Sequence, residues 1–338
     1  MKPLAAILVV AVIATAAAQQ PRIGIIDFYG VHRTPLGDVR AALAIKEGDT
    51  IPEALEAREQ SEMQLARLPG VVDAHVGVVC CDNGRAILYV GIHERGAPVI
   101  RFRESPRGAE RLPADVVEAG ATFQKVFVDA VQQGQAGEDR TQGHALNDAP
   151  EVRAVQEHFI EFARRDLAVL RQVLRNSSER AHRALAAQVL GYVEDKQGIV
   201  DDLVRAMRDP AEEVRNNAMR ALLLFTWATP TPRRPTPRVP EGPFIEFIHS
   251  PVWSDRNKSV GAVAELTRTR DPRVLARVRT TALDSLVEMA RWKSSGHAEP
   301  ALLILARIAG RPDDEARSAL SQGRREPIID AAIAAASR

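Results

Sequence analysis

The sequence predicts an α+β domain at the N-terminus followed by an all-α solenoid of stacked helix pairs. The solenoid is indicated by a pattern of short amphipathic helices that recurs along residues 150–338. An aromatic content of only 4% suits helices that pack through alanine and leucine. The first domain is indicated by residues 22–96, in which strand-like and helix-like segments alternate.

The clearest helix pair is Leu203–Thr226. A first apolar stripe ends at Asp209–Pro210, because proline has no N–H to donate and disfavours a helical residue before it. A second stripe runs from Val214 to Phe225. Two helices of roughly ten residues are marginal alone in water. The apolar stripes therefore require neighbouring helices.

Similar stretches lie upstream and downstream of this pair. Arg183 precedes Arg215 by 32 residues, Arg279 follows it by 64, and Asp271–Pro272 repeats Asp209–Pro210 after 62. In the first copy, Asn176–Ser177 stands where Asp-Pro is expected. Periods in this range are typical of stacked helical solenoids.

These repeats resemble the HEAT-repeat family, in the short bacterial form also called phycobilisome-lyase HEAT-like. The resemblance covers residues 150–338 and depends on Asp209, Pro210, Val214, Arg215, Ala218, Ala221 and Leu222. It implies that the turn aspartate and the second-helix arginine pair between successive repeats. The residues to which it gives a structural role are Asp209, Pro210, Arg215, Asp271, Pro272, Arg279 and, more weakly, Arg183. It implies a fold and says little about activity.

Residues 1–18 predict a secretory signal peptide. Lys2 precedes the apolar run Leu4–Ala14, and small residues lead to a cleavage site between Ala18 and Gln19. The run is short for a membrane span, so an uncleaved anchor is the weaker alternative. We expect a periplasmic or secreted protein with no stable membrane span in the mature chain.

The length limits the number of domains, and the charge limits the class of partner. A chain of 338 residues suggests two or three domains. The net charge is +1 and acidic and basic residues are interleaved, so the basic patch of a nucleic-acid binder is not visible. The expected partners are therefore proteins and not nucleic acids.

Residues 22–96 predict a small β-α-α-β-β domain. The expected elements are a strand at Arg22–Tyr29, helices at Thr34–Ala44 and Pro52–Leu68, and strands at Val71–Cys81 and Arg85–Glu94. Asn83–Gly84 is a typical two-residue hairpin turn. That turn would place Val79 opposite Leu88 and Gly77 opposite Val90. The expected core face then carries His75, Val79, Cys81, Leu88, Val90 and Ile92.

This first unit resembles a POTRA domain. The resemblance rests on Ile25, Tyr29, Gly30, Leu43, Ile45, Lys46, Gly48, Asp49, Leu68, Pro69, Gly70 and Val71, and on the strand that ends at Glu94. It implies a periplasmic module that holds partner chains, often by pairing one of their strands with an open sheet edge. No membrane barrel follows, so a role in barrel assembly is not carried over.

Cys80 and Cys81 are the only cysteines. Neighbouring side chains on a strand point to opposite faces, which favours two unbonded residues. A vicinal disulfide or an intermolecular bridge is the alternative, since an exported protein meets oxidising conditions.

Residues 97–149 predict an extra strand at Pro98–Phe102, a helix at Leu112–Gln133 and a flexible link at Gly134–Asp148. The Pro-rich insertion at residues 230–243 interrupts the solenoid, either as a tolerated loop or as a partner-docking segment. The remaining expected helices are Glu151–Leu174, Ala298–Ala309, Asp313–Ser321 and Pro327–Ala336, of which the last three would form an irregular capping end.

No motif for chemistry is found. The sequence has no glycine-rich phosphate loop, nucleophile elbow or zinc-ligand spacing, so we predict no catalytic, cofactor or metal residues. The expected function is that of a non-catalytic, exported scaffold that grips protein partners through a helical-repeat face and an open sheet edge. One alternative is an enzyme or a lyase-type chaperone that loads a cofactor. Another is a cell-envelope assembly or division factor.

Overall fold

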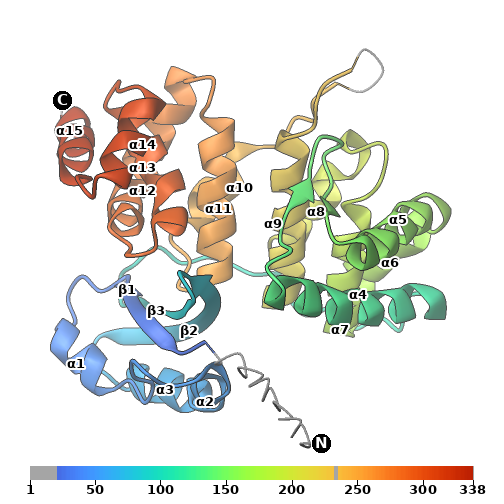
Figure 1. Ribbon diagram of the computed structural model, residues 1–338, viewed down its shortest axis with the longest axis horizontal. Helices are drawn as coiled ribbons and strands as arrows, with labels where there is room; N and C mark the ends of the chain where they lie inside the picture. Colours follow the sequence, from blue (N-terminus) through green and yellow to red (C-terminus); the bar gives the residue numbers. More distant parts are fainter. Residues whose placement is uncertain (1–20, 232–234, 338) are drawn as a thin grey trace, which may run out of the picture.

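The computed structural model describes residues 21–231 and 235–337, which form a small sheet domain and a larger array of paired helices (Figure 1). The predicted signal peptide with its Ala18–Gln19 cleavage site lies outside the described residues, as do residues 232–234 of the Pro-rich insertion. Within the described ranges, no helix combines the length and apolar character needed to cross a bilayer.

The N-terminal domain has a three-stranded sheet covered on one face by short helices. Its elements are β1 (Ile23–Tyr29), α1 (Leu36–Ala41), α2 (Ile51–Glu56), α3 (Arg58–Leu65), β2 (Val71–Asp82) and β3 (Arg85–Glu94). The strand order is β1-β3-β2, with β1 parallel and β2 antiparallel to the central β3. The single predicted helix at Pro52–Leu68 is two helices, which meet at Ala57.

The hairpin turn is confirmed, but the predicted register is wrong by one residue. Asn83 and Gly84 both have positive φ, and Asp82 pairs with Arg85. Beyond the turn, Val79 pairs with Ile87 instead of Leu88, because two residues of β2 oppose one residue of β3. Such a β-bulge turns the side chains of the preceding β2 residues, Asp73–Val79, to the face opposite to the predicted one.

The bulge consists of Cys80 and Cys81, which lie between the pairs on either side of the register shift. As a result, Ala74 and Val76 face the helices α1–α3, whereas the predicted core residues His75 and Val79 face the other way. The central strand β3 is buried on both faces. Its even-numbered residues pack on α1–α3, and Ile87 and Tyr89 pack on the solenoid.

The solenoid is a double layer of antiparallel helices. Its elements are α5 (Pro150–Arg165), α6 (Leu167–Asn176), α7 (Arg180–Leu190), the 3-10 helix η1 (Gln197–Ile199), α8 (Val200–Ala206), α9 (Glu212–Thr226), α10 (Glu241–Phe247), α11 (Trp253–Leu266), α12 (Pro272–Ala290), α13 (Ser295–Ile308), α14 (Asp313–Ser321) and α15 (Glu326–Ala336). The pairs are α6–α7, α8–α9, α10–α11 and α12–α13, and the second helices of successive pairs pack side by side. Helices α14 and α15 pack on α13 and end the array.

The segment between the two domains differs from its prediction in two places. No regular strand forms at Pro98–Phe102; residues 97–111 instead cross the solenoid as an extended strap towards α4 (Ala114–Gln132), which packs on α5 and α7. The expected flexible link is a packed hairpin of β4 (Glu138–Asp139) and β5 (Leu146–Asn147). Residues 143–147 are buried there, so the second half of this segment is part of the core.

Candidate functional site

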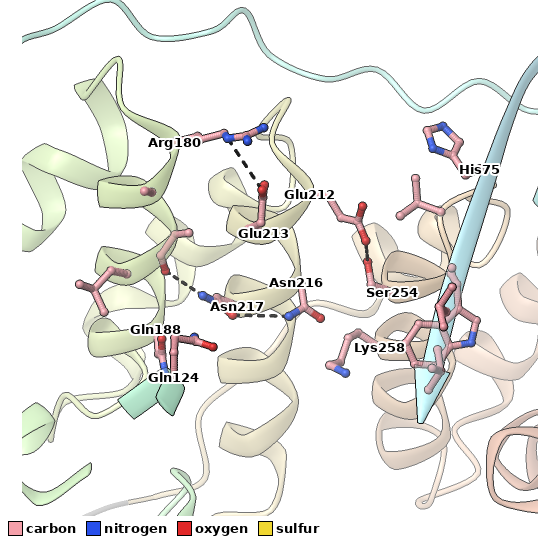
Figure 2. A pocket seen from close by; sticks show the side chains of 18 of the residues that line it. His75, Gln124, Arg180, Gln188, Glu212, Glu213, Asn216, Asn217, Ser254 and Lys258 are labelled. Atoms are coloured by element: carbon pink, nitrogen blue, oxygen red, sulfur yellow. Dashed lines mark hydrogen bonds and ion pairs between the residues drawn. The ribbon is translucent and has the colours of Figure 1, made fainter. Parts of the chain in front are cut away.

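A cleft of about 1210 Å³ lies between the N-terminal sheet and the solenoid (Figure 2). One wall is the middle of β2, residues 75–79, with α2 and α3 beside it. The opposite wall consists of α4, α7 and α9, and the first turns of α11 lie between the two walls. The cleft is therefore lined by an edge strand and by α7, α9 and α11, the second helices of their pairs.

Contacts between the sheet and the last repeats fix the position of the first wall. The hydroxyl group of Tyr29 donates a hydrogen bond of 2.7 Å to the carbonyl oxygen of Pro251. Tyr89 packs against Trp292, with ring centroids 4.8 Å apart, and its hydroxyl oxygen lies 2.6 Å from Nδ1 of His297. In Figure 1 the sheet accordingly lies against α11 and α12, across from α7 and α9.

Part of the outer edge of β2 is open towards the cleft. The N–H of Val76 donates to the carboxylate of Glu62 at 2.9 Å, which shows that it points away from β3. Since the direction alternates along a strand, the N–H and carbonyl of Val78 also point outwards. Neither group has a hydrogen-bond partner among the described residues. An unpaired edge of this kind can accept another strand.

The opposite wall carries both amide and apolar side chains. Gln124 of α4, Gln188 of α7, and Asn216 and Asn217 of α9 line it, and Asn217 donates to the carbonyl of Ala184 at 2.9 Å. Amide groups can both donate and accept, which matches the alternating groups of a polypeptide backbone.

The charged residues in the cleft are mostly paired. Arg58 contacts Glu62 at 3.9 Å and Arg180 contacts Glu213 at 3.9 Å. Glu212 accepts a hydrogen bond of 2.6 Å from Ser254. A further cationic residue, Lys258 of α11, also lines the cleft.

A ladder of buried arginines connects the repeats behind the cleft. Arg183 pairs with Asp209 at 2.8 Å, and Arg215 pairs with Asp255 at 2.9 Å. Each guanidinium also donates to carbonyl oxygens in the turn that precedes its own helix. Each arginine thus ties its own turn to a carboxylate of the next repeat.

The third arginine of this ladder is Arg256, which the sequence comparison missed. It donates to the carbonyl of Ser250 and pairs with Glu288 at 2.9 Å. Glu288 in turn accepts the N–H of Gly30 at 3.1 Å, so the ladder reaches the N-terminal domain. The Pro-rich insertion lies between Arg215 and Arg256 and lengthens this repeat, which hid the match.

Three of the predicted repeat residues take no part in the ladder. Asp271 caps α12 by accepting the N–H of Arg273, and Pro272 begins that helix. Arg279 donates to the carbonyl of Ala335. The similarity at shifts of 62 and 64 fell on α12, which is the first helix of its pair, so the expected pairing between successive repeats does not involve Asp271 or Arg279, and Arg215 pairs with Asp255 instead. Pro210 lies in the turn before α9.

Cys80 and Cys81 are exposed and are joined by a disulfide, whereas the sequence favoured unbonded residues. Within the described ranges, no three His, Cys, Asp or Glu side chains are grouped so that they could hold a metal ion.

Comparisons with known proteins concern the helical part. A family model described as HEAT repeats matches residues 167–232. A search of curated proteins finds no significant match. Among solved structures, a computationally designed armadillo repeat protein for modular peptide recognition is 16% identical over 56% of this chain and 94% of its own, with a TM-score of 0.36. A designed armadillo repeat protein in complex with the peptide (KR)4 is 17% identical over 58% of this chain and 97% of its own, also with a TM-score of 0.36.

These superpositions are loose, and the assignment depends on the family match and the helix pairs. The chain is therefore a mostly helical, solenoid-like repeat protein that is similar to HEAT repeats over residues 167–232 and carries a small N-terminal sheet.

Proposed function

We propose that this protein is an exported, non-catalytic scaffold that holds an extended segment of a protein partner in the cleft. The observation that carries the proposal is that the open edge of β2 and the inner helices α7, α9 and α11 line one cavity. The edge would supply backbone hydrogen bonds, and the amide and apolar side chains of the helices would select the sequence.

A POTRA-like nature of the N-terminal domain is part of this proposal. Its support is the element order, in which a strand and short helices precede a hairpin, together with β2 at an edge of the sheet. A role as a periplasmic partner-holding module would follow from that likeness.

Blocking the edge tests the proposal. Val78→Pro removes the outward N–H in the cleft, and proline is tolerated where an edge N–H faces away from the neighbouring strand. Val72→Pro is the control, because Val72 is an exposed β2 residue outside the cleft. We expect an envelope protein to copurify with the wild type and with Val72→Pro. Its recovery with Val78→Pro should fall about tenfold, which corresponds to the loss of one backbone hydrogen bond of about 1.4 kcal/mol. Equal recovery with all three proteins would refute the cleft as the binding site.

Export has its own test. The apolar run Leu4–Ala14 should direct secretion and be removed. We expect the N-terminus of the envelope-fraction protein to be Gln19 by mass spectrometry, and we expect Leu8→Arg to leave the full-length chain in the cytosol. An unprocessed chain in the soluble cytosolic fraction of wild-type cells would contradict export.

A further inference from the structure

Lys258 is a cation of the cleft that has no ion-pair partner among the described residues. It lies on α11, one helical turn after Ser254, and is half-buried. It lines both the cleft and an adjoining cavity of about 340 Å³ that extends towards Tyr192. In Figure 2 its ammonium group points from α11 towards α9. Among the residues that the structure describes, none accepts a hydrogen bond from it or forms an ion pair with it.

The surroundings of Lys258 are unfavourable for a free ammonium group. Burial lowers the pKa of Lys258 to about 8, the nearby Arg220 acts in the same direction, and Glu138 opposes them. The buried Arg183, Arg215 and Arg256 all have carboxylate partners. A buried charge without a partner costs stability, and an arriving anion would recover that cost.

Lys258 lies on α11, the helix that packs against the edge strand β2. A Cβ atom at Gly77 would lie 3.3 Å from Cβ of Trp253, so α11 covers the face of β2 that carries Gly77 and Val79. In an added strand, the residue opposite Gly77 points to the same face. Its side chain would therefore point to α11, and so would the residues two positions before and after it.

The rest of the lining limits which anion fits. Three carboxylates, of Glu62, Glu212 and Glu213, lie in the same cleft and balance the positive charges of Arg58, Arg180 and Lys258. A multiply charged phosphate would be repelled by them, whereas one carboxylate adds one charge beside one unpaired ammonium. The neighbouring side chains Val252, Trp253 and Leu185 are apolar.

We propose that the cleft selects an extended partner segment in which an aspartate or glutamate pairs with Lys258 and apolar residues stand two positions to either side. This inference rests on the proposed function and specifies its ligand. The carboxylate supplies the missing partner of the ammonium, and the flanking side chains cover the apolar part of α11 and α7.

Synthetic peptides test the selection. The first probe is an acetylated, amidated, fluorescent nonapeptide with valine at the odd positions, threonine at the even positions and glutamate in the centre. The second has glutamine in the centre. By fluorescence anisotropy at pH 7, we expect the glutamate peptide to bind wild type at least about tenfold more tightly than the glutamine peptide. Lys258→Arg should keep this ratio, and Lys258→Met should abolish it.

The pH dependence gives a second readout. Pairing with a carboxylate raises the pKa of Lys258 above its free value, so the glutamate preference should be complete below about pH 8 and should decline as the pH rises through the bound-state value. Lys258→Arg should show no such decline up to pH 10, since a guanidinium stays protonated. Lys258→Met should also raise the melting temperature of the free protein. The same measurement checks that the variant is folded.

The matched control is Lys125→Met, which removes an exposed lysine of α4 that does not line the cleft. It should leave the glutamate preference unchanged. Equal binding of both peptides to wild type, no binding of either, or a preference that survives Lys258→Met would overturn this inference. The proposed function would still stand in each case if Val78→Pro releases the envelope partner.

Discussion

Replacing Asp209 by alanine is expected to lower the free energy of unfolding by about 3–5 kcal/mol, since it leaves buried charges without a partner. Asp209 is fully buried and accepts from Arg183 of the preceding repeat, from Arg103 of the strap and from the N–H of Ala211. Alanine would remove four hydrogen bonds, of which Arg183 donates two, and would leave the Arg183 guanidinium buried. Urea denaturation followed by circular dichroism measures the change.

The control for this variant is Asp271→Ala. The sequence suggested that Asp271 is equivalent to Asp209, but in the structure it only caps α12. Loss of an N-cap typically costs about 1 kcal/mol. If Asp271→Ala destabilises as much as Asp209→Ala, the ladder described above does not distinguish the two positions.

The Asp209 effect should depend on pH in one direction. Burial alone would raise the pKa of Asp209, but hydrogen bonds from Arg183, Ala211 and Arg103 outweigh it and the net pKa is lowered. A carboxylate with a depressed pKa stabilises fully above the unfolded-state value and loses that contribution as the pH falls through the folded-state value. The difference between wild type and Asp209→Ala should therefore be full above pH ~5 and shrink as the pH falls below ~4.

Replacing Gly91 by alanine is expected to undock the N-terminal sheet from the solenoid, at a cost of about 2–4 kcal/mol. An added Cβ would overlap the carbonyl oxygen of Pro251 and would lie 2.6 Å from the ring of Tyr29. Both are held by the hydrogen bond between them, so the backbone must move apart. The first wall of the cleft would shift with the sheet.

Small-angle scattering should then show a larger radius of gyration, and limited proteolysis should cut the strap between residues 97 and 111. Partner binding in the cleft should fall as well. Gly37→Ala is the control, because a Cβ at Gly37 in α1 meets no atom within 4 Å. That variant should be neutral or slightly more stable. If Gly91→Ala leaves scattering and proteolysis unchanged, the sheet is not held by this contact.

Part of this structure could be predicted from local sequence patterns. The short helices from Pro150 onward follow from apolar spacing and from turns such as Asp209–Pro210. The hairpin follows from Asn83–Gly84, which tolerate positive φ. The bulge at Cys80–Cys81 was not readable, because alternation along β2 looks the same in either register. The cleft could not be predicted either, because Lys258 and Val78 line it only once β2 and α11 are brought together by the tertiary fold.

The sequence by itself determined the two-part architecture, since helix and strand periods and turn residues act over a few positions. Only the tertiary structure decided that β3 is buried on both faces, that Arg256 and not Arg279 continues the ladder, and that an open strand edge and an unpaired lysine share a cleft. These features depend on contacts between residues far apart in the chain, such as Tyr29 with Pro251, which local patterns do not encode.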